Sequence, residues 1–170
     1  MFKNESSQMV SSGLFSADGA HRYQLTKEWD KEKKTITVIT KHPHYDGVYV
    51  NDLTTHLICN ELVRLDYGIA HFVNLYSKIR TVGATGTLKE DFDTHTDIHI
   101  IKAIKSSDDV LIAWGSIDTA PAYQDRINDL IQQIKETKKP IMSLVNPTND
   151  QVTHPLSPAA RSEWVLKKYK

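Results

Sequence analysis

Two short loops contain the side chains of this chain that are best suited to chemistry. The first spans residues 41–44, with the sequence Lys-His-Pro-His, and Asp46 follows it closely. The second spans residues 153–157, with the sequence Thr-His-Pro-Leu-Ser. A neutral imidazole takes a proton from water or donates a hydrogen bond to a developing anion, and a carboxylate activates water. His42, Asp46 and His154 are therefore the candidate catalytic residues.

The hydrophobic pattern places both loops after predicted strands. Apolar runs and apolar–polar alternation predict five strands, at residues 22–29, 35–40, 69–75, 108–115 and 140–145. Apolar side chains at helical spacing predict three helices between them, at residues 53 to about 67, 94–105 and 123–137. Asn51 or Asp52 is the expected N-cap of the first helix, and Gly68 is expected to end it. In the second helix, Ile98 is among the isoleucines expected to face the core.

This order of elements predicts an α/β fold. Alternating strands and helices favour three layers, with a mostly parallel central sheet and helices on both faces. The strands at 22–29 and 35–40 are joined by the charged connection 30–34, so they are expected to pair as an antiparallel β-hairpin at one edge. Residues 1–170 are expected to form a single domain, with a candidate flexible N-terminal segment over residues 1–20.

Composition narrows the possible functions. The 21 basic and 21 acidic residues cancel, which excludes a strongly basic surface for indiscriminate nucleic-acid binding but leaves room for a local basic edge. Cys59 is the only cysteine, which excludes an intramolecular disulfide and a cysteine-ligated iron–sulfur cluster. The chain has neither an 18-residue apolar run nor the apolar core of a signal peptide at its N-terminus. We therefore expect a cytoplasmic protein that does not bind a membrane.

Polar residues also follow the other predicted strands. Asn74 lies at the end of one strand, the Trp114-Gly115 pair at the end of the next, and Asn146 after the last. Because open α/β sheets bind ligands at the carboxyl ends of their strands, we expect these residues to share one rim with the two loops.

Several motifs between residues 21 and 164 resemble domain-of-unknown-function family 1643. They are Arg22-Tyr23-x-Leu25-Thr26-x-x-Trp29-Asp30, Phe72-Val73-Asn74-Leu75-Tyr76, Val110-Leu111-Ile112-Ala113-Trp114-Gly115 and His154-Pro155-Leu156. Several of them are also similar to motifs of uracil-DNA glycosylases, whose fold that family is expected to share. The shared order runs through His42-Pro43, Asn74, residues 112–115 and residues 154–158.

The resemblance to uracil-DNA glycosylases implies roles for these residues on DNA. The target base must be extruded from a duplex, or presented in a single strand, before an enzyme can reach it. Asn74 would then pair with the O4 and N3 edge of uracil, and His154 would donate to the base oxygen that gains charge. Leu156 would wedge into the emptied stack, and Ser157 would contact a phosphate. The resemblance adds three further nucleic-acid-binding candidates in the first loop: Pro43, His44 and Tyr45.

The first loop departs from both groups of proteins. The family usually has Asn-Pro-Ser-Thr there, and the best-known glycosylases have Asp-Pro-Tyr, whereas this chain has His42-Pro43-His44-Tyr45. A neutral histidine does not supply the negative charge that balances the developing positive charge on the sugar. We therefore expect a protein that binds DNA or a flipped nucleobase, with uracil excision weak or absent. The alternatives are an active DNA glycosylase of non-standard base specificity, and a protein-interaction module that self-associates as a homo-oligomer.

Each candidate residue also has a structural alternative. His42 equally fits a role in holding its own loop, and Asn74 equally fits hydrogen bonding at a strand end. His154 also fits a simple loop terminus, and Trp114 fits the core better than a stacking platform. His95 and His99 have the spacing of a metal-binding pair, but no third ligand accompanies them, so neither a metal nor another cofactor is expected.

Overall fold

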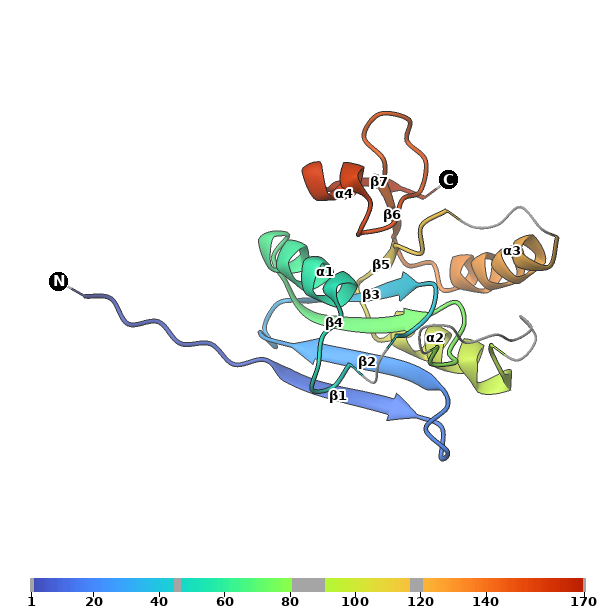
Figure 1. The fold of residues 1–170 in the computed structure, drawn as a ribbon, viewed down its shortest axis with the longest axis horizontal. Helices are drawn as coiled ribbons and strands as arrows, with labels where there is room; N and C mark the ends of the chain where they lie inside the picture. The colour runs from blue at the N-terminus through green and yellow to red at the C-terminus, as the bar shows by residue number, and fades with distance from the viewer. Residues whose placement is uncertain (1, 45–46, 81–90, 117–120, 170) are drawn as a thin grey trace.

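The computed structural model describes residues 2–44, 47–80, 91–116 and 121–169, and within them seven strands form one sheet (Figure 1). The sheet has the order β1-β2-β4-β3-β5-β6-β7. The strands are β1 (Val10–Phe15), β2 (Arg22–Glu28), β3 (Lys34–Thr40), β4 (Tyr67–Asn74), β5 (Asp109–Ile112), β6 (Ile141–Val145) and β7 (Val165–Lys168). The helices are α1 (Leu53–Arg64), α2 (Thr94–Lys105), α3 (Pro121–Glu136) and α4 (Pro158–Ser162). The expected α/β class is therefore confirmed, and the three predicted helices are present.

The sheet is parallel only at its centre. Strands β4, β3, β5 and β6 are parallel neighbours, because a helix carries the chain back between successive strands. The pairs β1–β2, β2–β4 and β6–β7 are antiparallel. Among the described residues the two kinds of pairing are equal in number, so the expected parallel majority is not confirmed. The segment 1–20, expected to be flexible, contains β1, and Figure 1 shows residues 2–9 extending away from the sheet.

The predicted pairing of the two leading strands is wrong. Strand β4 lies between β2 and β3, and the hairpin at that edge of the sheet consists of β1 and β2. The physical reason is the burial of β3, whose last five residues are buried. A strand buried on both faces belongs at the centre of a parallel sheet, not at its edge.

The N-cap of α1 is Asp52, which is one of the two predicted residues. The predicted end of the helix at Gly68 is wrong, because α1 ends at Arg64. The Asp52 carboxylate accepts a hydrogen bond of 2.6 Å from the Thr55 backbone N–H. The residue with positive φ after the helix is Asp66, at 64°, while Gly68 lies within β4. Gly68 is needed for a different reason, because a Cβ there would lie 1.8 Å from the carbonyl oxygen of Asp30.

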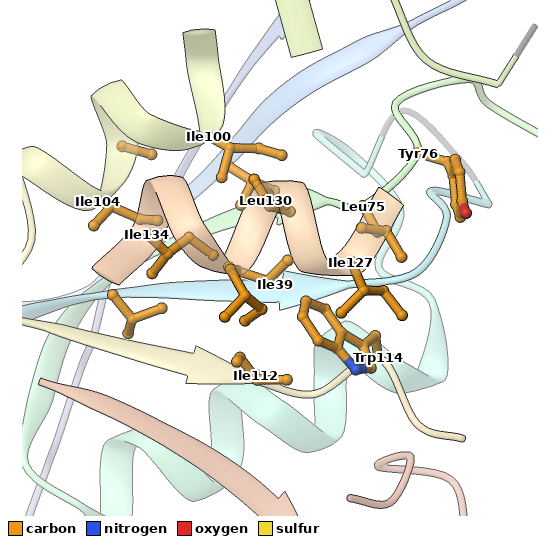
Figure 2. Packing of buried hydrophobic residues seen from close by; sticks show 14 residues of the cluster. Ile39, Leu75, Tyr76, Ile100, Ile104, Ile112, Trp114, Ile127, Leu130 and Ile134 are labelled. Carbon is orange, nitrogen blue, oxygen red and sulfur yellow. The ribbon is translucent and has the colours of Figure 1, made fainter. Parts of the chain in front are cut away.

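Helices cover both faces of the sheet. On one face, α2 and α3 pack on β3, β4 and β5, and Figure 2 shows Ile127 and Ile134 of α3 above the strands that carry Ile39 and Ile112. On the other face, α1 and α4 pack on apolar residues of β2 to β6. Trp114 belongs to the first core, which agrees with its structural alternative. The orientation predicted for Ile98 is wrong, because α2 turns Ile100, Ala103 and Ile104 inward and leaves Ile98 exposed.

The chain reverses its winding between β3 and β5. From β3 it crosses through α1 to β4 on one side, and from β5 it crosses through α3 to β6 on the other. Because α1 and α3 lie on opposite faces, a crevice opens at the carboxyl ends of β3 and β5, as is general at such switch points. No helix among the described residues is long and apolar enough to cross a bilayer.

Candidate functional site

A pocket of about 440 Å³ opens at this reversal point, and we call it the switch-point pocket. Its walls come from the residues after β3, the first turn of α1, the residues after β5, and single side chains of other elements. Phe72 and Trp114 line it and are almost fully buried, so part of the wall is aromatic. Its volume lies within the range typical of small-molecule sites.

Arg22 places a buried positive charge on this wall. Its side chain is 3% exposed, and its Nη2 donates a 3.2 Å hydrogen bond to Asn74 Oδ1. The Asn74 Nδ2 in turn donates to Thr40 Oγ1 at 2.7 Å. Asn74 is 1% exposed and is not among the residues that line the pocket. Its carboxamide thus links Arg22 to the end of β3, which agrees with its structural alternative at a strand end.

His154 lines the same pocket with a defined tautomer. The Leu156 backbone N–H donates to His154 Nδ1 at 3.2 Å, so the proton of the neutral ring lies on Nε2. Burial lowers the pKa of His154, which keeps the ring neutral near pH 7. Gly115, at φ 80°, allows this approach, because a Cβ there would lie 2.9 Å from His154 Cβ. His154 is therefore a neutral hydrogen-bond donor on the pocket wall.

His42 lines the pocket and stacks on an aromatic side chain. Its ring stacks on Tyr76, with centroids 4.8 Å apart, and its buried Nδ1 has no hydrogen-bond partner among the described residues. Burial lowers the pKa of His42 to about 4, with Arg80 and Lys41 opposing protonation and Asp91 favouring it. The next residue, Pro43, is buried and its carbonyl accepts from the Arg80 N–H at 3.2 Å. His42 is thus an uncharged side chain at neutral pH.

The stability of the fold is expected to decline in mild acid because of His42. Its pKa falls from 6.5 to about 4 on folding, so below pH 6.5 the unfolded chain takes up a proton that the folded chain does not. The contribution is complete above pH 6.5 and is lost as the pH falls toward 4. The full shift corresponds to about 3 kcal/mol, which solvent screening of the half-buried ring reduces to on the order of 2 kcal/mol. Denaturant unfolding measured between pH 7.5 and pH 4 checks this.

His42→Phe is the matched variant for that measurement. Phenylalanine retains the stacking on Tyr76 but does not titrate, so its stability is expected to fall less between pH 6.5 and 4. His71, His99 and His154 also have lowered pKa values and are unchanged in the variant. Equal pH dependence of the parent and the variant would contradict the assignment to His42.

Two further cations and one carboxylate complete the described charges of the pocket. Lys41 places its Nζ 5.1 Å from the centroid of the Tyr123 ring. Arg80 forms an ion pair with the buried Asp91, with an Nε–Oδ1 distance of 3.3 Å. Asp52 is the carboxylate among the described lining residues, and it caps α1. The described lining therefore contains more cationic side chains than carboxylates, which favours an anionic ligand.

The structure brings some of the predicted site residues together and separates others. His42, His44 and His154 line the switch-point pocket. Four other predicted residues do not line it. Pro43, Leu156 and Ser157 lie close in the chain to a histidine that does, and Asn74 forms a hydrogen bond with the lining residue Arg22. Tyr45 and Asp46 lie outside the described residues.

Hydrogen bonds of Ser157 fix the conformation of the second predicted loop. Leu156 is 39% exposed, and Ser157 caps α4 by accepting from the Ala160 N–H at 3.2 Å. Ser157 Oγ also accepts from Thr153 Oγ1 at 2.9 Å. An exposed apolar side chain on a braced loop agrees with a contact role for Leu156, which stays a prediction.

Sequence reasoning missed Arg22 and Arg80 as pocket residues, and it placed Lys41 in the first loop without giving it a role of its own. A signal existed for Arg22, which is a charged residue at the start of an otherwise alternating strand. In a strand antiparallel to the central ones, the first residue lies at their carboxyl edge. Arg80 had no comparable signal, because it lies in an irregular segment whose path only the fold defines.

The described residues include no group of three or more His, Cys, Asp or Glu side chains placed to hold a metal ion. His95 and His99, the pair with metal-ligand spacing, instead pack around Tyr23, with ring centroids 6.0 and 5.0 Å from it.

The fold and the pocket define an open α/β protein with a pocket at a topological switch point. The chain belongs to the family described as protein of unknown function (DUF1643), whose model matches residues 22–156. Comparisons with curated proteins and with solved structures found no match. The family resemblance is thus confirmed, whereas these comparisons give no support to the resemblance to uracil-DNA glycosylases, which stays a hypothesis.

Proposed function

We propose that the switch-point pocket binds a nucleobase together with its phosphate, in single-stranded DNA or flipped from a duplex, and that uracil excision is weak or absent. The observation that carries this proposal is that cationic side chains and the neutral hydrogen-bond donor His154 line the same pocket. Arg22 and Lys41 suit a phosphate, while the small exposed parts of Phe72 and Trp114 offer a base apolar contact rather than a stacking platform.

The state of His154 supports recognition of a base. Its Nδ1 is held by the Leu156 N–H, so its Nε2–H is the donor that the ring offers. A carbonyl oxygen of a pyrimidine accepts such a hydrogen bond. Because the pKa of His154 is lowered, the ring recognises this oxygen without adding a charge to the pocket.

The acid–base groups support binding more than excision. Water activation requires a base, and charge stabilisation at the sugar requires a carboxylate. His42 is a weak base because its pKa is lowered to about 4, and it supplies no negative charge; the carboxylate of Asp52 already accepts from Thr55 N–H at 2.6 Å. Among the described lining residues, the groups suited to binding are therefore available, whereas the groups that catalysis needs are weakly basic or already hydrogen-bonded.

Fluorescence anisotropy with a short labelled single strand of DNA tests the proposal. We expect binding that weakens as salt is added, because phosphate contacts release counterions. His154→Ala is expected to lower the affinity about tenfold, since one hydrogen bond to the base is lost. Leu156→Ala is expected to lower it by a smaller factor, through loss of apolar contact.

His95→Ala is the matched control, because His95 is an exposed histidine on α2 outside the pocket. Its affinity for DNA is expected to equal that of the parent. Unchanged affinity in both the His154 and Leu156 variants would reject the proposal, as would the absence of binding by the parent at moderate salt.

An active DNA glycosylase of non-standard base specificity is the second candidate, because Asp52 lines the pocket. Release of uracil or of other modified bases from labelled oligonucleotides distinguishes the two functions. We expect weak release of uracil, or none, by the parent. Strong release that disappears in Asp52→Asn, while DNA binding persists, would favour the glycosylase instead.

A further inference from the structure

A second pocket, of about 550 Å³, lies between α2 and α3, and we call it the α2–α3 pocket. It shares no described lining residue with the switch-point pocket. The residues that matter for its chemistry are Tyr76, Phe92, Asp97, Asp125, Arg126 and Asp129.

The described charges of this pocket are mainly negative. Arg126 and Asp97 compensate each other in a bidentate ion pair, with Nη1 donating to Oδ2 at 2.8 Å. The Arg126 guanidinium also lies over Phe92, 4.2 Å from the ring centroid. Asp125 and Asp129 are exposed and lie four residues apart on α3, so they share one helix face. These two carboxylates give the pocket a net negative charge, in contrast to the cationic side chains of the switch-point pocket.

The buried side chain of Tyr76 is a second observation at this pocket, independent of its charges. Its side chain is 0% exposed, it lines the pocket, and its hydroxyl has no hydrogen-bond partner among the described residues. Figure 2 shows Tyr76 at the border of its core cluster, apart from the other labelled side chains. A buried hydroxyl without a partner is unfavourable, and such groups in folded proteins generally have a function or an additional partner.

Tyr76 also separates the two pockets. One face of its ring stacks on His42 of the switch-point pocket, and Tyr123 packs edge-on at 6.0 Å between centroids. On the side of the α2–α3 pocket, Phe92 lies 6.0 Å from the same ring. Tyr76 and the rings packed around it therefore lie between the two pockets, which share no described lining residue.

We propose that the α2–α3 pocket binds a small organic ammonium ion that has an apolar body and a distal hydroxyl group. Its ammonium group pairs with Asp125 and Asp129, and its body lies along Phe92. Its hydroxyl group forms a hydrogen bond with Tyr76 Oη, which satisfies the buried phenol. This ligand class is independent of the DNA or nucleobase proposed for the other pocket.

Calorimetric titration of the full chain with four matched compounds tests this proposal. Tyramine has the ammonium, the aromatic body and the hydroxyl, and we expect it to bind saturably. Phenethylamine lacks the hydroxyl and is expected to bind about fivefold more weakly, as for loss of one hydrogen bond. Tyrosol, which lacks the charge, is expected to bind about threefold to fivefold more weakly than tyramine. 4-Hydroxyphenylacetate, which carries the opposite charge, is expected not to bind.

Variants locate the site. Asp125→Asn combined with Asp129→Asn is expected to weaken tyramine about fivefold, whereas Glu136→Gln, on the same helix outside the pocket, leaves binding unchanged. Tyr76→Phe is expected to reduce tyramine binding to the level of phenethylamine. The same variant is expected to retain or raise the thermal midpoint, because an unpartnered buried hydroxyl is removed.

The ligand series on the parent protein is decisive even if a variant fails to fold. No saturable binding of tyramine overturns the proposal. Equal affinity for tyramine and tyrosol overturns the assignment of an ammonium ligand. An unchanged preference for tyramine over phenethylamine in folded Tyr76→Phe overturns the role of the Tyr76 hydroxyl.

Discussion

Gly68→Ala is expected to destabilise the fold by about 3 kcal/mol or more, the largest effect of a single methyl group that we expect in this chain. The new Cβ would lie 1.8 Å from the carbonyl oxygen of Asp30 and 2.8 Å from Lys33 Cβ. The oxygen belongs to the backbone, so no side-chain rotation relieves the clash. The Gly68 carbonyl also accepts hydrogen bonds from the Trp29 and Asp30 N–H groups, at 2.9 and 3.1 Å. Denaturant unfolding of parent and variant measures the loss.

Gly19→Ala is the matched control for this measurement. Gly19 has no atom within 4 Å of an added Cβ, but its φ of 72° is unfavourable for alanine. Its expected loss is therefore about 1 kcal/mol, from backbone conformation alone. A loss in Gly68→Ala no larger than that in Gly19→Ala would show that β4 and the turn after β2 separate easily.

Local sequence patterns predicted which segments form helices and strands better than they predicted which of these segments lie side by side. The spacing of apolar residues predicted α2 over residues 94–105, because an amphipathic helix is specified by its own sequence, although the pattern placed Ile98 on the wrong face. The position of β4 between β2 and β3 was not predictable in the same way, because strand order depends on contacts between distant segments. Gly68 shows this limit of local patterns. Its position after a helix suggested a helix cap, but glycine is needed there because the backbone carbonyl of Asp30 lies against it in the folded chain.

The site was predictable where a loop follows a parallel strand. The general rule for such sheets placed His42 and His154 at one rim, and both line the switch-point pocket. The rule does not say which way a side chain points, so it did not predict that the Asn74 carboxamide is held by Arg22 and Thr40. Hydrogen bonds between side chains of separate strands are properties of the folded chain, and the sequence gives no periodic signal for them.

Asn74→Asp is expected to retain the fold and to weaken DNA binding about tenfold or more. The substitution is isosteric, and the Asn74 side chain is engaged at both its oxygen and its nitrogen, accepting from Arg22 Nη2 at 3.2 Å and donating to Thr40 Oγ1 at 2.7 Å. In the variant, the Thr40 hydroxyl rotates and donates to the new carboxylate oxygen. The new negative charge lies beside Arg22 and opposes a phosphate in the pocket by about 2 kcal/mol at an effective dielectric constant near 20.

Two measurements separate this positioning role from the reading of a base by Asn74. If Asn74 acts through Arg22, the aspartate variant binds strands that contain uracil, thymine or cytosine with equally reduced affinity. If Asn74 pairs with the base, loss of its N–H donor penalises uracil and thymine, whose O4 needs a donor, more than cytosine. Asn74→Leu adds a test of the network itself, because it leaves the buried groups of Arg22 and Thr40 without this partner. Its stability is expected to fall by about 2 kcal/mol, whereas a stable leucine variant with unchanged DNA affinity would exclude a positioning role for Asn74.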